Sequence, residues 1–298
     1  MLDIRDYKYT KKNEFKIGRA GITSETEKCP AKADAEKLIQ QNVAEIAGLQ
    51  EKLYAEKKEG VVFVVQAMDA AGKDGTIRVV FGPLSTHGVK EIPFKTPSKT
   101  ELAHDFLWRV AKELPEKGEI AIFNRSHYED VLIGKVRQLY LGQAHADRID
   151  TKNVIKNRYK DIVNFEKYLY NNSIRVVKIF LNVSQEEQVN RFIARMDTPE
   201  KNWKVSAGDL AESELWEDYQ QAFEDMINAT ACKEAPWYVV PADHKWYMRL
   251  IVSEIVLATL KEMDPKFPEL PQEEIAKFET YKEKLRARVA RKPEEEKS

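Results

Sequence analysis

A glycine and a lysine in the segment FVVQAMDAAGKDGTIR, residues 63–78, point to phosphate chemistry. Gly72 and Lys73 occupy the second glycine and the lysine of the phosphate-loop pattern G-x-x-x-x-G-K-[ST]. Two positions depart from that pattern, because Ala67 stands in place of the first glycine and Asp74 in place of the hydroxyl residue. A lysine beside a glycine turn can hold a phosphate through its ammonium group. The segment is therefore predicted to be a variant phosphate loop.

Asp69 can supply the metal ligand that the altered loop lacks. A carboxylate at the entrance of the loop is a good oxygen ligand for Mg²⁺, whereas Asp74 cannot provide the usual neutral hydroxyl. Thr76 carries a hydroxyl one turn further along, in a direction that the sequence does not fix. The metal ligand is thus expected to move forward to Asp69, with Mg²⁺ as the predicted ion and Mn²⁺ as a substitute.

The backbone of the loop is expected to bind phosphate as well. N–H groups at the start of a helix point outward and attract anions, and this loop lies between a β-branched run, VVFVVQA, and an expected helix. The alternative is a plain strand-to-helix turn in which Gly72 and Gly75 only relieve strain. The predicted phosphate-binding residues are Ala70, Ala71, Gly72, Lys73, Asp74, Gly75 and Thr76.

A second predicted strand, 119–124, ends in Asn124, where P-loop enzymes carry a metal-binding acid. Arg125 follows at the carboxyl end of that strand, where open α/β sheets bind ligands. Glu129 lies one turn into the expected helix and could reach a metal or a substrate. The alternative is a helix-capping Asn124 with Arg125 and Glu129 in solvent. His127 is interpreted as structural, because phosphoryl transfer requires little base chemistry.

Arg191 and Arg195 lie four residues apart in an expected helix and therefore share one face. They precede a loop that carries Lys201 and Lys204. Residues 198–213 are predicted to form a lid. Arginines that directly precede a mobile basic loop are typical of a lid that closes on phosphates. The alternative is a solvated helix in a charge-rich chain.

Five predicted strands alternate with helices along the chain. The strands are 61–67, 89–94, 119–124, 174–183 and 236–242, and the main helices are 34–58, 73–81, 98–114, 125–140, 151–172, 185–196, 212–230 and 245–263. Ser98 with Glu101 and Ser184 with Glu187 have the spacing of capping boxes. This alternation predicts a three-layer α/β/α fold around a five-stranded parallel sheet.

The chain is interpreted as a single domain over residues 1–298. Residues 1–32 show no clear period and are expected to form an N-terminal extension. Residues 264–298 are punctuated by proline and then highly charged, which predicts a peripheral helix and a solvated tail.

The composition excludes several classes of protein. The 298 residues contain 48 Lys and Arg against 49 Asp and Glu, a balance that argues against a dedicated nucleic-acid binder. No apolar run approaches the roughly 20 residues needed to span a bilayer, so no membrane partner is expected. Cys29 and Cys232 lack the spacing of a metal site, which favours a reducing compartment. With an N-terminus that is too charged for a signal peptide, a cytoplasmic protein is predicted.

Four blocks, in order, give the chain a family resemblance: QAMDAAGKDGT, FNRSHYEDVL, NWKVSAGDL and APWYVVPADHKW. Together they resemble the family-2 polyphosphate kinases over roughly residues 35–260. The resemblance implies a P-loop kinase-like fold with a helical lid, and reversible, Mg²⁺-dependent phosphoryl transfer between inorganic polyphosphate and nucleotides. It also implies a homo-oligomer, a dimer or a tetramer. By resemblance, the catalytic residues are Asp69, Lys73, Arg125, Glu129, Arg191 and Arg195.

The second block narrows the resemblance to a subgroup. Many members read FDRSWYNR where this chain has Asn124, His127 and Glu129. The chain is similar to the subgroup that accepts both nucleoside mono- and diphosphates, such as AMP and ADP, and we link Glu129 to that breadth. The implied nucleotide-binding residues are Lys73, Asn124, Arg125, Glu129 and Lys204. Either Asp69 alone or Asp69 with Glu129 holds the metal.

A long polyanion requires a basic groove, yet the net charge of the chain is −1. Asymmetric charge is therefore expected near the ends of the strands. The candidates are Lys73, Arg78, Lys90, Lys95, Lys99, Arg125, Lys135 and Arg137, of which Arg78 and Lys135 join the predicted polyphosphate-binding set.

Two rival functions remain open. An ATP-dependent nucleotide kinase of the thymidylate or adenylate type would share the loop and the lid, although such enzymes more often keep Ser or Thr after the lysine. A non-catalytic protein that binds nucleotide or polyphosphate would explain why Asn124 and Asp74 interrupt two metal positions.

Overall fold

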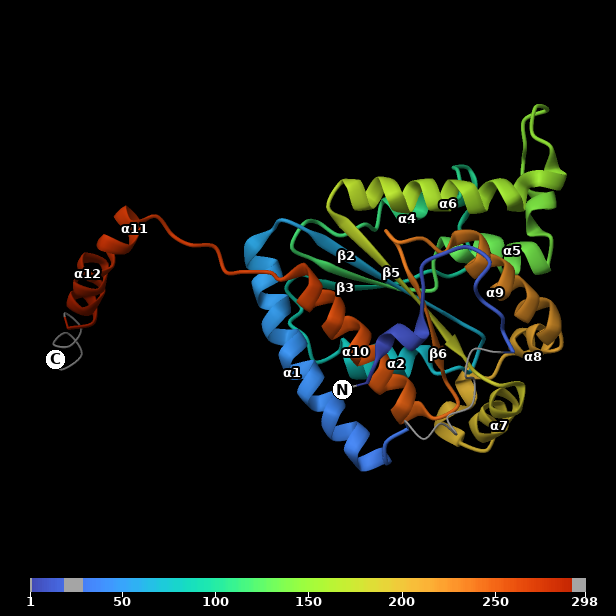
Figure 1. Cartoon of the computed structure of the whole chain (residues 1–298), viewed down its shortest axis with the longest axis horizontal. Helices are drawn as coiled ribbons and strands as arrows, with labels where there is room; N and C mark the ends of the chain where they lie inside the picture. The colour runs from blue at the N-terminus through green and yellow to red at the C-terminus, as the bar shows by residue number, and fades with distance from the viewer. Residues whose placement is uncertain (1, 19–28, 291–298) are drawn as a thin grey trace, which may run out of the picture.

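A six-stranded sheet in the order β1-β6-β5-β2-β4-β3 forms the centre of the protein, as seen in a computed structural model that describes residues 2–18 and 29–290 (Figure 1). The five predicted strands are all present and parallel: β2 (Gly60–Ala67), β3 (Val89–Pro93), β4 (Ile120–Asn124), β5 (Ile174–Asn182) and β6 (Trp237–Pro241). The predicted α/β fold is therefore confirmed.

The prediction of five strands requires one correction at the edge of the sheet. β1 (Lys8–Tyr9) pairs antiparallel with β6, so part of the expected N-terminal extension belongs to the sheet. Two residues are too few to show a period of 2, which is why the sequence pattern did not reveal this strand.

The register of the sheet brings the phosphate loop and the second motif together. β2 lies between β4 and β5, and its run of β-branched residues is buried, as expected for a central parallel strand. Val65 of β2 is paired with Asn124 of β4, so both chains leave the sheet at the same edge. Asp69 and Arg125 follow those two strands and therefore meet at this edge of the sheet.

Helices cover both faces of the sheet (Figure 1). One group contains α1 (Lys32–Glu56), α2 (Lys73–Val80) and α10 (Lys245–Met263), and α10 packs against both other helices. The other group contains α5 (Ile133–Val136), α6 (Val154–Asn171) and α9 (Trp216–Thr230). α7 (Gln185–Met196), a 3-10 helix (Pro199–Lys204) and α8 (Ala207–Ser213) follow β5 and lie beside the phosphate loop.

Two predicted helices are broken in the structure. The segment 98–114 forms only α3 (Lys99–Leu102) and α4 (Trp108–Ala111), because the carboxylate of Asp105 accepts the N–H of Leu107 and starts a new turn. The segment 125–140 forms a 3-10 helix (His127–Val131), then α5 and a further 3-10 helix (Leu139–Gly142). Continuous helices over these two segments were wrong predictions.

The two predicted capping boxes differ in the structure. The box at Ser98 and Glu101 is complete. At the start of α7, the hydroxyl of Ser184 accepts the N–H of Glu187, but the N–H of Ser184 donates to Asp243 at 2.8 Å. The carboxylate of Glu187 is instead paired with Arg191 at 2.6 Å, so the second box is only half formed.

The C-terminal helices α11 (Gln272–Ala276) and α12 (Phe278–Ala290) extend away from the body (Figure 1). Within residues 2–18 and 29–290, no helix combines the length and the hydrophobicity needed to cross a membrane.

An ion pair lies fully buried below the second motif. The ammonium of Lys178, on β5, contacts Glu166 of α6 at 2.6 Å and the carbonyl of Thr230 at 3.0 Å. Glu166 also accepts the hydroxyl of Tyr128 at 2.8 Å and lies 3.8 Å from the imidazole of His127. Burial alone would raise the pKa of Glu166, but the contacts with Lys178 and His127 together outweigh it and lower the pKa. His127 thus belongs to a buried structural network.

Replacing Lys178 by Met should lower the free energy of unfolding by about 3–5 kcal/mol, because Glu166 is then a buried charge without its partner. The double variant Lys178→Met with Glu166→Leu should recover most of this loss. Urea unfolding measures both values. Arg175→Met, on the same strand, removes partly exposed pairs with Glu59 and Glu262 and should cost only about 1 kcal/mol or less; an equal loss in both single variants would contradict the prediction.

Candidate active site

The phosphate loop turns without the first glycine of its pattern. Ala67 is the last residue of β2, and the left-handed conformations fall instead on Ala70 (φ 64°) and Gly72 (φ 104°). Gly72 is also tightly packed, since an added Cβ would lie 3.0 Å from Met248 Cε. α2 starts at Lys73, and Gly72 offers no side-chain acceptor to the first turn. The N–H groups of that turn are therefore available to an anion.

Thr76 does not face the ligand side of the loop. Its hydroxyl donates to the carbonyl of Gly72 at 3.0 Å, and the side chain is buried beside Met248. Like many threonines within helices, it bonds back to the preceding turn.

Arg191 fixes the backbone of the phosphate loop. A guanidinium has five N–H donors, and here all five bind protein oxygens. Nη1 donates to the carbonyls of Ala70 (3.1 Å) and Ala71 (2.7 Å), Nη2 donates to those of Ala242 (2.6 Å) and Asp243 (2.8 Å), and Nε donates to Glu187 (2.6 Å). The predicted lid-entry arginine thus touches the loop, but its hydrogen bonds serve to hold the loop in shape.

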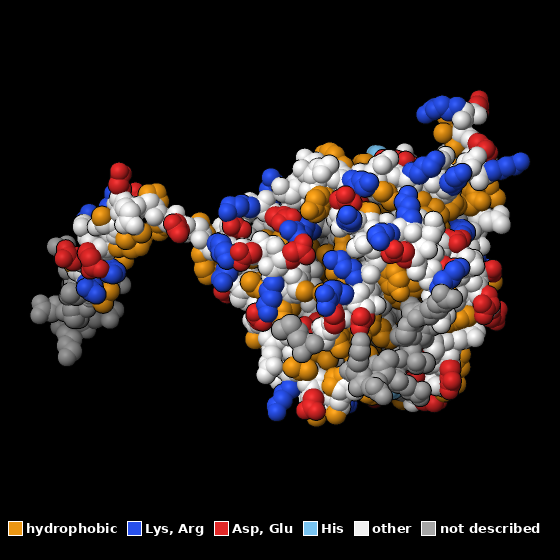
Figure 2. Space-filling view, in the orientation of Figure 1, with side chains coloured by type: hydrophobic (Ala, Val, Ile, Leu, Met, Phe, Trp, Pro, Cys, Tyr) orange, Lys and Arg blue, Asp and Glu red, His pale blue; other side chains and the backbone are white. Residues whose placement is uncertain are grey.

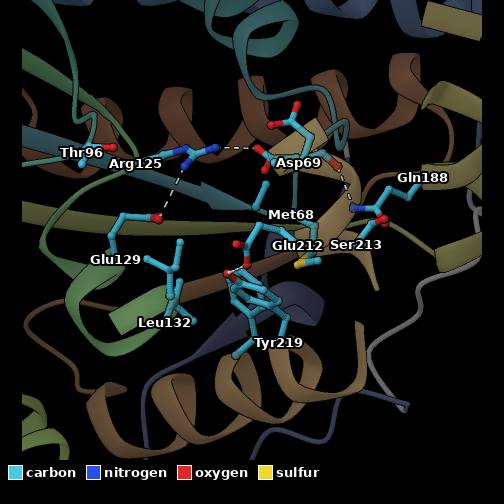
Figure 3. Close-up of a pocket in the computed structure, with 15 residues that line it drawn as sticks. Met68, Asp69, Thr96, Arg125, Glu129, Leu132, Gln188, Glu212, Ser213 and Tyr219 are labelled. Atoms are coloured by element: carbon cyan, nitrogen blue, oxygen red, sulfur yellow. Dashed lines mark hydrogen bonds and ion pairs between the residues drawn. The ribbon is translucent and has the colours of Figure 1, made fainter. Parts of the chain in front are cut away.

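Arg125 links the two carboxylates that the sequence singled out (Figure 3). Its Nη2 donates to Asp69 Oδ1 at 2.5 Å, and its Nη1 lies 3.7 Å from Glu129 Oε2. Burial alone would lower the pKa of Arg125, but the carboxylates of Glu129 and Asp69 outweigh it and raise the pKa. Its backbone has φ 65°, an uncommon conformation for a residue other than glycine and one that often occurs at functional sites.

Glu129 and Lys73 are both held in unfavourable surroundings. Burial raises the pKa of Glu129, and burial lowers the pKa of Lys73. With its amide oriented to satisfy its neighbours, Gln66 donates to Glu129 Oε1 at 2.8 Å. A phosphate group bound at Lys73 would stabilise its charged form, so the site is prepared for an anion.

A pocket of about 310 Å³, here called the Arg125 pocket, lies beside these charges (Figure 3). It combines apolar side chains with a rim of polar ones. The lining residues that matter for recognition are Met68, Asp69, Thr96, Arg125, Glu129, Leu132, Ile133, Asp209, Glu212, Ser213, Tyr219 and Phe223. Its charged side chains are four carboxylates, Asp69, Glu129, Asp209 and Glu212, and one arginine, so an anionic ligand would need a bound cation to offset the acids.

A second pocket of about 450 Å³, here called the basic pocket, lies on the other side of the loop. Its cationic lining residues are Arg78, Arg191, Arg195, Lys201, Lys204, Lys245 and Arg249, and in the described part of the chain Asp74 is the one acid that lines it. Burial and neighbouring positive charges lower the pKa of Lys245 and of Arg249. The basic pocket therefore concentrates positive charge that a polyanion can neutralise.

The phosphate loop separates the two pockets. Asp69 lines the Arg125 pocket, and Ala70, the next residue, lines the basic pocket. The loop therefore borders both pockets.

Arg195 and Lys204 connect the predicted lid to the basic pocket. Arg195 Nη1 donates to the carbonyl of Lys204 at 3.1 Å and contacts Asp209 at 3.4 Å. Lys204 lies in the basic pocket, whereas Arg125 and Glu129, two other predicted nucleotide ligands, line the Arg125 pocket.

Several basic residues predicted from the sequence lie elsewhere. Lys135 is paired with Asp225, Arg137 with Glu212 at 3.1 Å, and Lys90 with Glu113 at 2.6 Å, and none of the three lines either pocket. The structure therefore does not gather these three cations at either pocket, and their part in polyphosphate binding stays a prediction.

Lys245 and Arg249 are the cations that sequence reasoning missed. They lie four residues apart at the start of α10, directly after β6. This is the arrangement of Arg191 and Arg195 after β5, so the same spacing rule could have found them.

Asn124 joins two carboxylates near the loop. Its Nδ2 donates to Asp74 Oδ1 at 3.1 Å and to Glu91 Oε1 at 3.0 Å. An aspartate at this position would place a third acid against the other two. The amide therefore fixes Asp74 to β3 without the need for a cation.

Asn124→Asp is expected to lower the Tm by a few degrees in EDTA, because three neighbouring carboxylates repel one another at a cost of about 1 kcal/mol. Mg²⁺ should restore the Tm of this variant more than that of the parent. Asn124→Ala, which removes the amide without adding charge, is the control and should not respond to Mg²⁺. Thermal unfolding with and without the ion measures all three proteins, and equal Mg²⁺ responses would contradict the prediction.

The residues present fit a Mg²⁺ ion that shares its ligands with a substrate. Mg²⁺ in kinases commonly takes one or two carboxylates and completes its coordination with phosphate oxygens and water. Asp69 and Glu129 line the same pocket, with Arg125 between them. Within residues 2–18 and 29–290, no group of three His, Cys, Asp or Glu side chains could hold a metal alone.

A mostly parallel sheet with a glycine-lysine loop after β2, a second motif after β4 and a basic segment after β5 is the arrangement of a P-loop kinase-like phosphotransferase. The family model described as Polyphosphate kinase 2 (PPK2) matches residues 30–268. The chain therefore belongs to the polyphosphate kinase 2 family, as the four sequence blocks indicated.

Similar proteins agree with this membership. An ADP-polyphosphate phosphotransferase of Rhodopseudomonas palustris is 42% identical over 87% of this chain and 93% of its own length. An AMP/ADP-polyphosphate phosphotransferase of Meiothermus ruber is 46% identical over 74% of this chain and 79% of its own. The crystal structure of polyphosphate kinase 2 from Arthrobacter aurescens superposes with a TM-score of 0.78 at 39% identity, covering 87% of this chain and 89% of that one.

Proposed function

We propose that the protein transfers the terminal phosphoryl group of inorganic polyphosphate to AMP and ADP, forming ADP and ATP in a reversible, Mg²⁺-dependent reaction. The observation that carries this proposal is the pair of pockets on either side of the phosphate loop. Seven cationic side chains line the basic pocket, and all except Arg191, which holds the loop, are candidates to bind a polyanion. The Arg125 pocket combines one arginine and apolar surface with four carboxylates, whose charge a bound Mg²⁺ would offset beside a nucleotide.

The geometry supports a direct transfer between the two pockets. Polyphosphate in the basic pocket would place its terminal phosphoryl group at Lys73 and at the N–H groups of the first turn of α2. Arg125 would hold the phosphate of the nucleotide, whose oxygen attacks that phosphoryl group while the bond to the shortened polyphosphate breaks. Asp69 and Glu129 would hold a bound Mg²⁺, which would offset the charge of the phosphates. Positioning and charge stabilisation are what this reaction chiefly requires.

The choice of AMP and ADP rests on the relatives and on Glu129. The similar proteins from R. palustris and M. ruber are named for ADP and for AMP/ADP. Glu129 lies in the Arg125 pocket within 3.7 Å of the arginine, where it can adjust how far the nucleotide phosphates enter. We therefore propose that Glu129 allows both mono- and diphosphates to be used, with Asp69 as the principal metal ligand and Glu129 as a second one.

Supplying the donor separately tests this function against the rival ATP-dependent kinase. Purified protein with Mg²⁺ and AMP or ADP should form product when polyphosphate is the sole donor. With ATP as sole donor and AMP as acceptor, the rate should be at least about tenfold lower, because a single triphosphate spans less of the basic pocket. Product formed only with ATP would favour the rival kinase, and no turnover with either donor would favour a binding protein.

The acid side of the pH profile should depend on Glu129. Burial raises its pKa above the ordinary value of 4.5, so its ionised form is lost at a higher pH than usual as the pH falls. We expect the rate with AMP to decline on that limb and Glu129→Gln to remove the decline while lowering the rate at neutral pH. Kinetics from about pH 5 to pH 8 check this; an unchanged acid limb in the variant would contradict it.

The raised pKa of Glu129 also makes the free energy of unfolding depend on pH. A carboxyl whose folded pKa exceeds its unfolded pKa stabilises the fold below the unfolded pKa and loses that contribution as the pH rises through the folded value. Glu129→Gln should therefore resist urea slightly better than the parent at neutral pH.

We also propose that the protein acts as a cytoplasmic homo-oligomer, a dimer or a tetramer, following the family resemblance. The mass in solution and the fractionation of cells would test these two points separately.

A further inference from the structure

The C-terminal arm, defined as residues 264–290, exposes far more apolar surface than its length predicts. Of the 21 large hydrophobic side chains exposed among the described residues, seven lie in the arm: Phe267, Leu270, Ile275, Phe278, Tyr281, Leu285 and Val289. The arm is less than a tenth of the chain but carries a third of these residues. Concentrated apolar surface of this kind marks an interaction site more often than chance exposure.

The apolar residues of α11 and α12 form one stripe. Ile275, Phe278, Tyr281, Leu285 and Val289 follow one another at intervals of three and four residues, which places them on one helical face. Figures 1 and 2 show the arm well away from the body, with hydrophobic side chains gathered along it. A helix of 13 residues is marginal in water by itself, so packing of this stripe would be needed to stabilise it.

The catalytic unit does not account for the arm. The match to the family ends at residue 268, before α11 begins at Gln272. The described residues that line the Arg125 pocket and the basic pocket all precede residue 250. The stripe is therefore free to serve an interaction outside the active site.

The charges of the arm indicate what covers the stripe. Residues 272–279 contain three acids and one base, a net charge of −2, whereas residues 280–290 contain four bases and one acid, a net charge of +3. Two arms side by side in the same direction would bring like charges together. Two antiparallel arms would set the acidic half of each against the basic half of the other.

We propose that the C-terminal arm is a self-association surface, which packs its stripe antiparallel against the arm of a second copy of this chain. The pair is symmetric, as expected for a homodimer, and it crosses near Tyr281. Five apolar side chains from each copy make a small interface beside the roughly 1,000 Å² typical of stable specific complexes. Association through the arm is therefore expected to depend on protein concentration.

Matched charge insertions on the two faces of α12 test the surface. Phe278→Glu with Leu285→Glu places two acids in the stripe, and Thr280→Glu with Ala287→Glu places two acids on the opposite face. Sedimentation over a range of concentrations should show self-association of the parent and of the second variant, weakened at least tenfold in the first. Turnover per chain at saturating substrates should be the same in all three. Equal masses for the two variants, or a parent that stays monomeric, would overturn the proposal.

Single cysteines test the antiparallel arrangement. In a background with Cys29→Ser, which leaves only the buried Cys232, Tyr281→Cys should form a covalent dimer under mild oxidation because the two copies of this residue meet. Val289→Cys should not, since an antiparallel pair holds its two copies at opposite ends. Cross-linking at both positions would indicate a parallel pair, and cross-linking at neither would place the stripe on another surface; either result contradicts the proposal.

Discussion

Asp69→Asn is expected to lower kcat by about 10³-fold with either acceptor, the larger of the two main effects predicted for this protein. The substitution keeps the size of the side chain but removes the charge that contacts Arg125 at 2.5 Å and that we propose as the principal metal ligand. Groups that stabilise developing charge in a phosphoryl transfer are commonly worth 10²–10³-fold in rate, or more when a metal is involved. The KM for AMP should change much less than kcat.

Steady-state kinetics with polyphosphate and saturating Mg²⁺ measure this effect. Asp218→Asn, at an exposed position of α9, is the matched control and should retain the parental rate. Thermal unfolding of both variants verifies that the fold is intact. A rate above a tenth of the parental value in Asp69→Asn would show that the metal and Arg125 do not depend on this carboxylate.

Arg191→Lys should lower kcat by about 10²-fold, even though the positive charge remains. An ammonium has three donors and cannot reach the carbonyls of both Ala70 and Ala242, which the guanidinium binds at 3.1 Å and 2.6 Å. The loop would lose the geometry that aims its N–H groups, and a small displacement at a reacting centre can cost this much in rate. Some loss of stability should accompany it, because buried carbonyls are left without donors.

A comparison with Arg249→Met separates loop positioning from polyphosphate binding. Arg249 lines the basic pocket, and its substitution should raise the KM for polyphosphate while kcat changes little. Arg191→Lys should show the opposite split, with kcat reduced and the KM for polyphosphate within about threefold of the parent. If Arg191→Lys raised only the KM for polyphosphate and left kcat unchanged, Arg191 would bind the polyphosphate directly.

The parts of the fold that could be predicted from the sequence are those with strong local signals. The buried run before Ala67 defined a central strand, and Gly72-Lys73 located the phosphate loop after it. Parallel strands leave a sheet at one edge, and the pairing of β2 with β4 in the structure explains why Asp69 and Arg125 meet there. Alanine can occupy position 67 because the left-handed backbone conformations of the loop lie further along, at Ala70 and Gly72.

The contacts and roles that the sequence did not reveal depend on tertiary structure. Nothing near Arg191 in the sequence shows that carbonyls from two other segments take up its donors. The segment after Arg125 has a helical pattern, yet the buried contacts of Tyr128 with Glu166 bend it into a 3-10 turn. Lys135 was predicted to bind phosphate, but in the structure its ammonium pairs with Asp225, on a helix 90 residues further along the chain. Pairings over such distances in sequence are set by packing and leave no local signature.

The most direct test follows AMP, ADP and ATP over time in one reaction that contains the purified protein, Mg²⁺ and polyphosphate as the sole phosphoryl donor. If the two pockets deliver donor and acceptor to one phosphate loop, ADP should rise first and then fall while ATP accumulates, and Lys73→Ala should abolish both steps. A reaction that yields no ADP from AMP, or one that proceeds unchanged in Lys73→Ala, would contradict transfer at this loop.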